Sequence, residues 1–296
     1  MTLWTPAMPP QSPHSPQTIL LTGATGRLGR LLTQELIKTG HRLRILTRDP
    51  LAAHALFGDA VSIKRGDLSD PESLPRAVEG ISRMFLLSPI AEDMATQQTN
   101  LLRAAAKAGV QRVVKLSGSD WTIGASASGN AHALIEERGT ELFPEFVAIR
   151  PNAWAQVALA PTLRHLSEGG PLLIRHGEAP VSYIDIRDIV DVAHHQLLAA
   201  KARQKPLVIT GPQALTAIEI ADLASRLLAR PVTIGPPPPL PSSDTFEGRV
   251  IAQFSALIAA GAASSVSPTT ERLLRRPARS LATYFTKTLA PELLTA

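Results

Sequence analysis

Residues 22–29 read TGATGRLG and join a short β-rich run, Thr18–Thr22, to an amphipathic segment, Arg27–Thr39. Three glycines spaced as G-x-x-G-x-x-G allow a tight turn, a close approach of the backbone to a pyrophosphate, and close packing of the helix on the strand. The pyrophosphate then lies at the helix N-terminus, where unpaired backbone amides favour an anion. Because a strand precedes these glycines and a helix follows them, we interpret the segment as a dinucleotide-binding loop rather than as a glycine-rich structural turn.

The chain beyond this loop alternates between short β-rich runs and longer helical periods. Parallel neighbours in a sheet need crossover connections, so this alternation predicts a parallel sheet with helices on both faces. We expect an α/β protein with a Rossmann-type doubly wound parallel sheet and a smaller C-terminal α/β lobe on the substrate side. The expected strands of the first half are Thr18–Thr22, Leu43–Thr47, Val61–Lys64, Arg83–Leu87, Arg112–Ser117 and Phe146–Arg150.

The pattern divides the chain into three segments. Residues 1–16 contain five prolines and few large apolar side chains, which predicts a disordered tail. We assign residues 17–152 to a nucleotide-binding Rossmann domain and residues 153–296 to a substrate-side lobe that shares its sheet. The elements expected in that lobe are helices at Ala155–Ser167 and Ile186–Ala200, strands near Leu172–Arg175 and Pro206–Thr210, a helix at Thr216–Ala229 that begins with a capping box of Thr216 and Glu219, and a helical stretch after the proline run Pro236–Pro239.

Composition excludes several classes of protein. The chain has 296 residues and no cysteine, so it has no disulfide framework, no cysteine-ligated metal and no cysteine nucleophile. Its longest apolar runs, such as Ala252–Ala263, are interrupted by polar residues and are shorter than the roughly 20 residues that a membrane span needs. We therefore expect a soluble, cytoplasmic protein without a membrane partner. The net charge of +5 is spread along the chain, which gives no indication of nucleic-acid binding.

The end of the second expected strand indicates which dinucleotide binds. Roughly 20 residues after the glycines, an acid binds the ribose 2′-hydroxyl of NAD, whereas an arginine accepts the 2′-phosphate of NADP. Here Arg48 comes first after the strand, and Asp49 followed by Pro50 is typical of a helix N-cap with proline at the first helical position. We predict NADP(H) in preference to NAD(H), with Arg48 and also Arg27 beside the phosphate. The alternative is that Arg48 is a solvated surface charge and Asp49 binds the ribose.

Asp67 and Leu68 follow the third expected strand. An aspartate at this point can accept a hydrogen bond from the adenine amino group while Leu68 covers the ring. The alternative is that Asp67 supports the turn and that Asp70, followed by Pro71, caps a helix. Both can hold, because the two aspartates occupy different positions.

Six motifs occur in an order that resembles one known family. They are TGATGRLG (22–29), GDLSD (66–70), RVVKLSGS (112–119), HALIE (132–136), IRPN (149–152) and YIDIRD (183–188). In this order they resemble the NmrA-like atypical short-chain dehydrogenase/reductases over about residues 18–290. That group includes NAD(P)H-dependent quinone oxidoreductases, triphenylmethane reductases, agroclavine-type imine reductases and a non-catalytic redox sensor. The resemblance implies a Rossmann fold and NAD(P)H binding.

The resemblance also implies roles for residues at matching positions. The glycine loop would hold the pyrophosphate, Arg48 the 2′-phosphate, and Asp67 with Leu68 the adenine. Ser88 would lie by the adenosine ribose, and the nicotinamide would lie near Ser117 and Pro151. The full set of expected cofactor contacts is Gly23, Thr25, Gly26, Arg27, Leu28, Gly29, Arg48, Asp67, Leu68, Ser88, Ser117 and Pro151.

The catalytic pair of the wider short-chain dehydrogenase group is missing. Those enzymes use Tyr-x-x-x-Lys, in which the nearby ammonium depresses the pKa of the phenol so that it can exchange a proton with the substrate oxygen. Between Ser117 and Arg150 this chain has no tyrosine and no lysine, and its only tyrosines are Tyr183 and Tyr284. Alcohol oxidation by the standard route is therefore disfavoured, as is epimerase or dehydratase chemistry on nucleotide sugars.

His132 and Glu136 lie four residues apart on the helix expected after the fifth strand, so they share a face. A histidine near its ordinary pKa of about 6.5 could donate a proton or position an acceptor ring. We take His132 and Ser117 as candidate catalytic residues. The alternative is a packing role, in which the carboxylate holds the imidazole and the pair braces the helix.

Trp121 and Trp154 each follow the carboxyl end of a strand, where open α/β sheets bind ligands. With Asn152 they are expected to shape a substrate pocket for an aromatic molecule, although both tryptophans could also be core residues.

Two other clusters are interpreted as structural. His194 and His195 point about 100° apart on a helix and have no acidic neighbours, so we expect no metal site. Asp185 is interpreted as the N-cap of the helix Ile186–Ala200 rather than as half of a carboxylate pair with Asp188.

These features predict an NADPH-dependent reductase that transfers a hydride directly to a conjugated, electron-poor small molecule such as a quinone, an imine or a related aromatic. A quinone fits the missing catalytic pair, because its reduced anion is stable enough to take a proton from water. The alternative is a regulatory protein that binds NADP(H) without turnover and passes the redox state to a protein partner.

Overall fold

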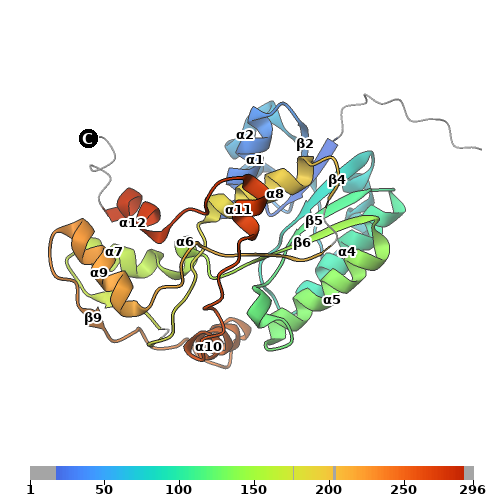
Figure 1. The fold of residues 1–296 in the computed structure, drawn as a ribbon. Helices are drawn as coiled ribbons and strands as arrows, with labels where there is room; N and C mark the ends of the chain where they lie inside the picture. The colour runs from blue at the N-terminus through green and yellow to red at the C-terminus, as the bar shows by residue number, and fades with distance from the viewer. Residues whose placement is uncertain (1–17, 176, 203–204, 290–296) are drawn as a thin grey trace, which may run out of the picture.

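The computed structural model describes residues 18–175, 177–202 and 205–289, so the predicted tail, residues 1–16, lies outside the described part of the chain. The strands of the central sheet are β1 (Thr18–Thr22), β2 (Arg42–Thr47), β3 (Ser62–Arg65), β4 (Ile81–Leu86), β5 (Arg112–Leu116), β6 (Glu145–Pro151) and β8 (Leu207–Ile209). They form a seven-stranded sheet in the order β3-β2-β1-β4-β5-β6-β8 (Figure 1). All neighbours are parallel. The strand order reverses between β1 and β4, which is the doubly wound arrangement that the sequence predicts.

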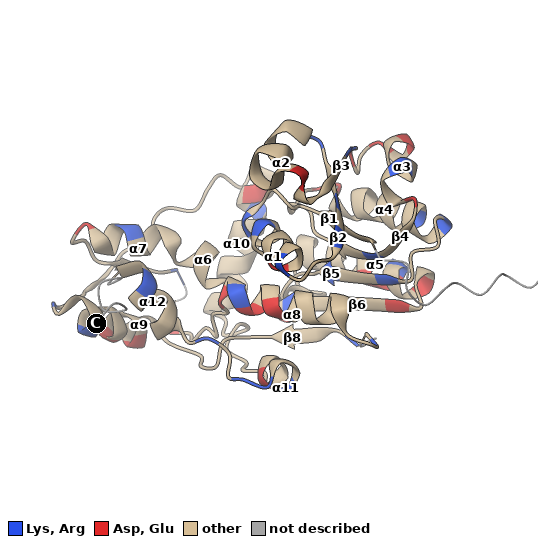
Figure 2. Cartoon of the chain, turned by 90° about the horizontal axis from the view of Figure 1, so that it is seen from above, with Lys and Arg blue, Asp and Glu red and all other residues tan. Residues whose placement is uncertain are grey.

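Helices cover both faces of this sheet. The helices of the first half are α1 (Arg27–Lys38), α2 (Pro50–Phe57), α3 (Pro75–Val78), α4 (Met94–Lys107) and α5 (Ala127–Leu142), and α8 (Ile186–Leu198) comes from the second half. Helices α1 and α8 share one apolar core with the sheet, in which Leu28, Leu32 and Leu36 are buried. Helices α4 and α5 share the core on the opposite face. Lysines and arginines are interspersed with acidic residues along the outer helices (Figure 2).

The second half of the chain adds a strand to this sheet and also builds a separate lobe. Strand β8 pairs with β6 in register Ile149↔Leu207. The lobe has its own apolar cluster, which includes Leu163, Ile220 and Phe285. Its elements are α6 (Ala155–Ala158), α7 (Ala160–Ser167), α9 (Ala217–Leu228), α12 (Leu281–Leu289) and the two-stranded sheet of β7 (Leu172–Leu173) and β9 (Ile234–Gly235). Two further helices are α10 (Phe246–Ala259) and α11 (Thr269–Leu274).

Side-chain caps begin two helices where the sequence predicts them. The Asp49 carboxylate accepts a hydrogen bond from the Ala52 amide at 3.0 Å, and Pro50 opens α2. Thr216 and Glu219 form the reciprocal capping box at the start of α9. The Asp49 carboxylate is therefore engaged in a local structural contact, which favours its interpretation as a cap.

The helix expected over Ala155–Ser167 is divided in two. Helix α6 ends at Ala158, and α7 begins at Ala160 with a proline in its first turn. Pro161 has no backbone N–H to donate and its ring excludes the preceding turn, so a continuous helix is disfavoured there. The sequence period alone did not reveal this break.

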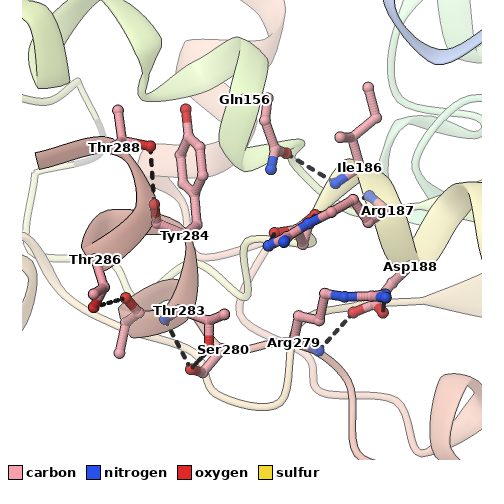
Figure 3. A network of polar contacts seen from close by, with 12 residues as sticks. Gln156, Ile186, Arg187, Asp188, Arg279, Ser280, Thr283, Tyr284, Thr286 and Thr288 are labelled. Carbon is pink, nitrogen blue, oxygen red and sulfur yellow. Dashed lines mark hydrogen bonds and ion pairs between the residues drawn. The ribbon is translucent and has the colours of Figure 1, made fainter. Parts of the chain in front are cut away.

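Asp188 holds the C-terminal segment against α8. Its carboxylate is fully buried and accepts hydrogen bonds from the Arg279 amide at 2.6 Å and from the guanidinium of Arg276 at 2.7 Å. Figure 3 shows Arg279 beside Asp188, with α12 continuing from it past Tyr284. Asp185 instead caps α8, accepting from the Arg187 amide at 2.8 Å. The two aspartates thus have separate structural roles, and the N-cap interpretation of Asp185 is confirmed.

We expect Asp188→Ala to lower the free energy of unfolding by about 2–3 kcal/mol. Removing one partner of a buried ion pair leaves the other charges uncompensated, which costs about 3–5 kcal/mol when all partners are buried. The side chains of Arg276 and Arg279 are 33% and 28% exposed, so water recovers part of that cost. Urea denaturation measures the change, with the exposed Asp59→Ala as control. A loss no larger than that of the control would contradict this role.

Candidate active site

The glycine loop leaves the N-terminus of α1 open to an anion. Gly26 is the N-cap residue and no side chain caps the helix, so its first backbone amides are available to a ligand. Gly23 has a φ of 64°, and an added Cβ would lie 2.9 Å from the Leu87 oxygen. A Cβ on Gly29 would lie 2.1 Å from the Gly23 oxygen, whereas one on Gly26 would meet only that atom, at 3.3 Å. Gly23 therefore allows the tight turn, and Gly29 allows the close packing of α1 against the loop. Gly26 instead faces open space.

A cavity of about 570 Å³ opens over this loop at the carboxyl ends of β1, β2 and β4. Ligand pockets typically measure roughly 300–1,000 Å³. Gly29 packs beneath the loop, while Ser117 and Pro151 lie further along the same edge of the sheet, at the ends of β5 and β6. The expected site residues that line the cavity are Gly23, Thr25, Gly26, Arg27, Leu28, Arg48, Asp67, Leu68, Ser88 and Trp154.

Arg48 and Asp67 lie together in this cavity. The Asp67 carboxylate accepts a hydrogen bond from the Ser69 amide at 2.9 Å, and this bond, together with the charge of Arg48, lowers the pKa of Asp67. Arg48 is exposed, and no hydrogen bond or ion pair joins its guanidinium to another residue in the described ranges. It is therefore free to receive an anionic group.

Arg27 lines the same cavity as Arg48 and also makes a contact with the second lobe. Its guanidinium donates a hydrogen bond to the backbone oxygen of Gln156 on α6. Gln156 in turn accepts from the Ile186 amide at 2.8 Å, a contact that Figure 3 shows at the start of α8. Arg27 thus connects the glycine loop to the second lobe, and its place beside the 2′-phosphate stays a prediction.

The structural alternative for the turn after β3 is present, and binding of adenine by Asp67 and Leu68 stays a prediction. Asp67 supports the turn through Ser69, and Asp70 accepts from the Glu72 amide at 3.2 Å as the cap of a short 3₁₀ helix. In the loop after β4, Ser88 accepts a hydrogen bond from the Gln98 side chain at 2.8 Å. Asp67 and Ser88 therefore keep fixed positions in the wall of the cavity.

A network of polar side chains lies between β5, β6 and α5. Lys115 Nζ lies 2.9 Å from His132 Nδ1. Ser117 Oγ donates to Glu136 Oε1 at 2.5 Å, and Arg150 donates to both Glu136 oxygens, at 3.1 and 2.6 Å. Lys115 and Ser117 are two residues apart on one strand, and His132 and Glu136 are four apart on one helix, so each pair shares a face. The network therefore follows from the packing of α5 on the sheet.

Burial keeps the His132 ring neutral. It lowers the pKa of His132 to about 2, and the charges of Lys115 and Arg150 act in the same direction. The expectation of a pKa near 6.5 is therefore wrong, and an imidazolium acid is not available near neutral pH. Lys115 is also fully buried, and burial lowers its pKa to about 7 against the opposing effect of Glu136.

Neither tyrosine lies in this network. Tyr183 belongs to the apolar cluster of the second lobe and Tyr284 packs against it. Burial raises the pKa of both phenols. Neither phenol therefore replaces the missing Tyr-x-x-x-Lys pair.

Asn152 is a buried hub rather than an open wall of a pocket. It is 4% exposed, accepts from Trp121 Nε1 at 2.5 Å, and donates to Ser182 at 2.5 Å and to the Ala263 oxygen at 2.8 Å. Trp121 also meets the Phe254 ring of α10 edge-on, with 5.5 Å between ring centroids. Of the three expected pocket residues, Trp154 lines the cavity over the glycine loop. Trp121 and Asn152 instead contact each other and residues of the second half of the chain.

Lys115 was not among the residues that the sequence pointed to. The lysine of the missing Tyr-x-x-x-Lys pair was sought after Ser117, whereas Lys115 precedes Ser117 on strand β5. The sequence did contain an indication of Lys115, because this lysine interrupts the apolar run RVVKLS. The strand that contains it is covered by helices on both faces, so its side chains are buried. A lysine in such a strand is buried and needs a partner.

No helix within the described ranges is long and apolar enough to cross a membrane. Among the same residues, no group of three or more histidine or acidic side chains could hold a metal ion.

The sequence profile of the NmrA-like family matches residues 15–118. An NAD(P)H azoreductase of Xenophilus azovorans is 30% identical over 223 residues, which cover 72% of this chain and 75% of the azoreductase. A (4-alkanoyl-5-oxo-2,5-dihydrofuran-3-yl)methyl phosphate reductase of Streptomyces griseus is 30% identical over 284 residues, 88% of this chain and 94% of that enzyme. The triphenylmethane reductase of Citrobacter sp., solved with NADP(H), aligns with a TM-score of 0.81 at 22% identity and covers 92% of this chain and 100% of its own. At 22% identity, this structural similarity shows a shared fold alone.

Proposed function

The chain belongs to the NmrA-like family and is an NAD(P)H-dependent oxidoreductase, and from this premise we propose that it is an NADPH-preferring reductase of conjugated, electron-poor small molecules. It transfers a hydride to the acceptor without a Tyr-x-x-x-Lys pair. The observation that carries the proposal is the cavity over the open N-terminus of α1, which also contains the unpaired guanidinium of Arg48.

The residues of the cavity fit a dinucleotide phosphate. The backbone of the glycine loop and the first amides of α1 bind the pyrophosphate, and Gly26 leaves room for it. Arg48 binds the 2′-phosphate through a charge-assisted contact that can be bidentate. Bound there, NADPH supplies the hydride. Ser117 and Pro151, at the ends of β5 and β6, then lie along the edge where the nicotinamide end of the cofactor is expected.

A neighbouring cavity supports an apolar acceptor. This second cavity, of about 180 Å³, shares Ala91 with the first. Its apolar walls come from Ala127 and Ala131 of α5 and from Phe246 and Val250 of α10, and Glu92, Arg249 and Gln253 add polar groups. These walls suit a flat apolar molecule, and the absence of a tyrosine acid disfavours a simple carbonyl. The azo group and the alkanoyl-substituted 5-oxo-2,5-dihydrofuran in the names of the azoreductase and of the Streptomyces griseus reductase are both conjugated, which supports a conjugated acceptor for this chain.

Consumption of NADPH by the purified protein tests this function. The acceptors offered are a quinone, an imine, a neutral azo dye and a cationic triarylmethane dye. We expect stoichiometric oxidation of NADPH with at least one of them. No oxidation with any acceptor, together with a clear preference for either the oxidised or the reduced cofactor, would instead support the regulatory role, because a redox sensor must bind the two forms differently.

A further inference from the structure

Lys115 and His132 are a buried polar pair that hydride transfer alone does not use. Lys115 is 0% exposed, and its hydrogen-bond partners are His132 Nδ1 at 2.9 Å and the Leu116 oxygen at 3.0 Å. Burying an ammonium without a carboxylate against it costs several kcal/mol. A buried titratable group that is costly to stability and lies near the ligand-binding edge of the sheet is a candidate for function.

The contact between the two side chains fixes the tautomer of the histidine. An ammonium can only donate, so Nδ1 of His132 accepts and the ring proton is on Nε2. Nε2 has no hydrogen-bond partner among the residues that the structure describes. The described residues do include fully buried polar atoms without a partner, but Nε2 of His132 is not one of these atoms. This N–H therefore reaches solvent. A chain of donors runs from the enclosed Lys115 through the ring to an open N–H.

The His132 ring lies at the carboxyl end of β5, the edge of the sheet where an acceptor is expected. The His132 ring packs on Gly118, the residue after Ser117, since a Cβ there would lie 2.6 Å from His132 Cδ2. The preceding residue, Ala131, lines the second cavity, which shares Ala91 with the cofactor cavity. An acceptor bound over the end of β5, beside the nicotinamide position expected at Ser117, would therefore be close to both the cofactor and His132.

We propose that Lys115 and His132 form a proton relay, in which Lys115 is the proton source and His132 delivers the proton to the acceptor; this rests on the proposed function. The acceptor gains the hydride from the reduced cofactor and, at its basic atom, the proton from His132 Nε2. At the same time His132 Nδ1 takes a proton from Lys115, whose ammonium becomes a neutral amine. After the product leaves, one proton from water returns through His132 and restores the pair.

The charges around the pair suit this relay. The groups that face it are Glu136 on α5, Arg150 on β6 and Asp120, which pairs with Arg150 at 2.7 Å. Burial brings the pKa of Lys115 to about 7, and a general acid works best when its pKa is near the operating pH. Burial also keeps the ring from becoming an imidazolium, so the proton must enter at Nδ1 as the other leaves from Nε2. Since the relay needs protonated Lys115, its rate falls as the pH rises above about 7.

Two acceptor substrates distinguish proton delivery by the relay from hydride transfer alone. A cationic triarylmethane dye needs only a hydride, whereas a neutral azo dye needs a hydride and a proton. Lys115→Met removes the ammonium and keeps a long apolar side chain in the buried site. We expect its kcat loss with the azo dye to exceed its loss with the cationic dye by at least about tenfold, within the range for removing a general acid. The fall of the azo rate above neutral pH should disappear, while NADPH affinity reports that the variant is folded.

Two controls separate a relay from a structural role. Lys107→Met, on the exposed side of α4, should leave the ratio of the two rates as it is in the unmodified protein. Lys115→Met combined with His132→Gln should lower the azo rate no further than the more damaging single variant, because two groups in series are not additive.

Nitrogen-15 NMR of histidine-labelled protein gives a readout apart from activity. We expect the Nε2–H tautomer of His132 at and below neutral pH, and its loss in Lys115→Met. An Nδ1–H tautomer in the unmodified protein, equal losses with both dyes, or reduction of the cationic dye but of no neutral acceptor would each overturn the relay while hydride transfer stands. Failure of the unmodified protein to oxidise NADPH with any acceptor would instead overturn the proposed function, and the relay with it.

Discussion

Gly26→Val is expected to weaken NADPH binding by more than about 100-fold while the protein still folds. An added Cβ at Gly26 meets one protein atom, the Gly23 oxygen at 3.3 Å, so the fold can accommodate the side chain with a small adjustment. The isopropyl group would fill the space in front of the first amides of α1, where we propose that the pyrophosphate binds. Loss of two charge-assisted hydrogen bonds of about 1.5 kcal/mol each accounts for a change of this size.

Gly29→Val is the matched variant with the opposite outcome. Its Cβ would lie 2.1 Å from the Gly23 oxygen and 2.7 Å from the Ala24 Cα, and these backbone atoms cannot move aside cheaply. We expect this variant to lower the melting temperature sharply. Calorimetric titration with NADPH and thermal denaturation by circular dichroism distinguish the two effects. If Gly26→Val kept normal NADPH affinity, the phosphate site would lie elsewhere.

Arg48→Ala is expected to abolish a preference for NADPH over NADH that exceeds about tenfold in the unmodified protein. The guanidinium is exposed and has no partner in the described part of the chain, so its contact with a 2′-phosphate breaks no existing ion pair. NADH lacks that phosphate, and its affinity should change little. Charge-assisted hydrogen bonds contribute about 1.5–3 kcal/mol, which corresponds to a factor of ten or more.

The comparison of the two nucleotides needs a control for net charge. Arg30→Ala removes an exposed arginine from α1 that does not line the cavity. It should leave the ratio of NADPH to NADH affinity unaltered. Equal affinity of the unmodified protein for the two nucleotides would refute the assignment of Arg48 and favour the alternative in which Arg48 is only a surface charge.

Local chemistry explains which parts of the fold were predictable. The glycine loop, the Asp49 cap with Pro50 and the Thr216 capping box each depend on residues within a few positions of one another, and all three form. The doubly wound sheet follows from the alternation of apolar periods. The break before Pro161 was missed because the helical spacing of apolar residues continues across this position. The backbone hydrogen bonds of a helix cannot continue there, since proline has no N–H.

The candidate site was less predictable, because its contacts join distant parts of the chain. The shared face of His132 and Glu136 follows from their spacing, but their partners Lys115 and Arg150 come from two neighbouring strands. The contact of Arg27 with Gln156 spans 129 positions, which no local pattern encodes. The pKa of His132 likewise depends on burial between α5 and the sheet, so the ordinary value was a poor guide.

Deuterium transfer from cofactor to product tests hydride transfer most directly. NADPH carrying deuterium at C4 of the nicotinamide is incubated with the protein and a cationic triarylmethane dye, whose central carbon holds the transferred hydrogen in a bond that does not exchange with water. Mass spectrometry of the reduced dye should find one deuterium with one of the two C4 stereoisomers of the label, and none with unlabelled NADPH in heavy water. Reduced dye without deuterium from either stereoisomer would contradict direct hydride transfer by this protein.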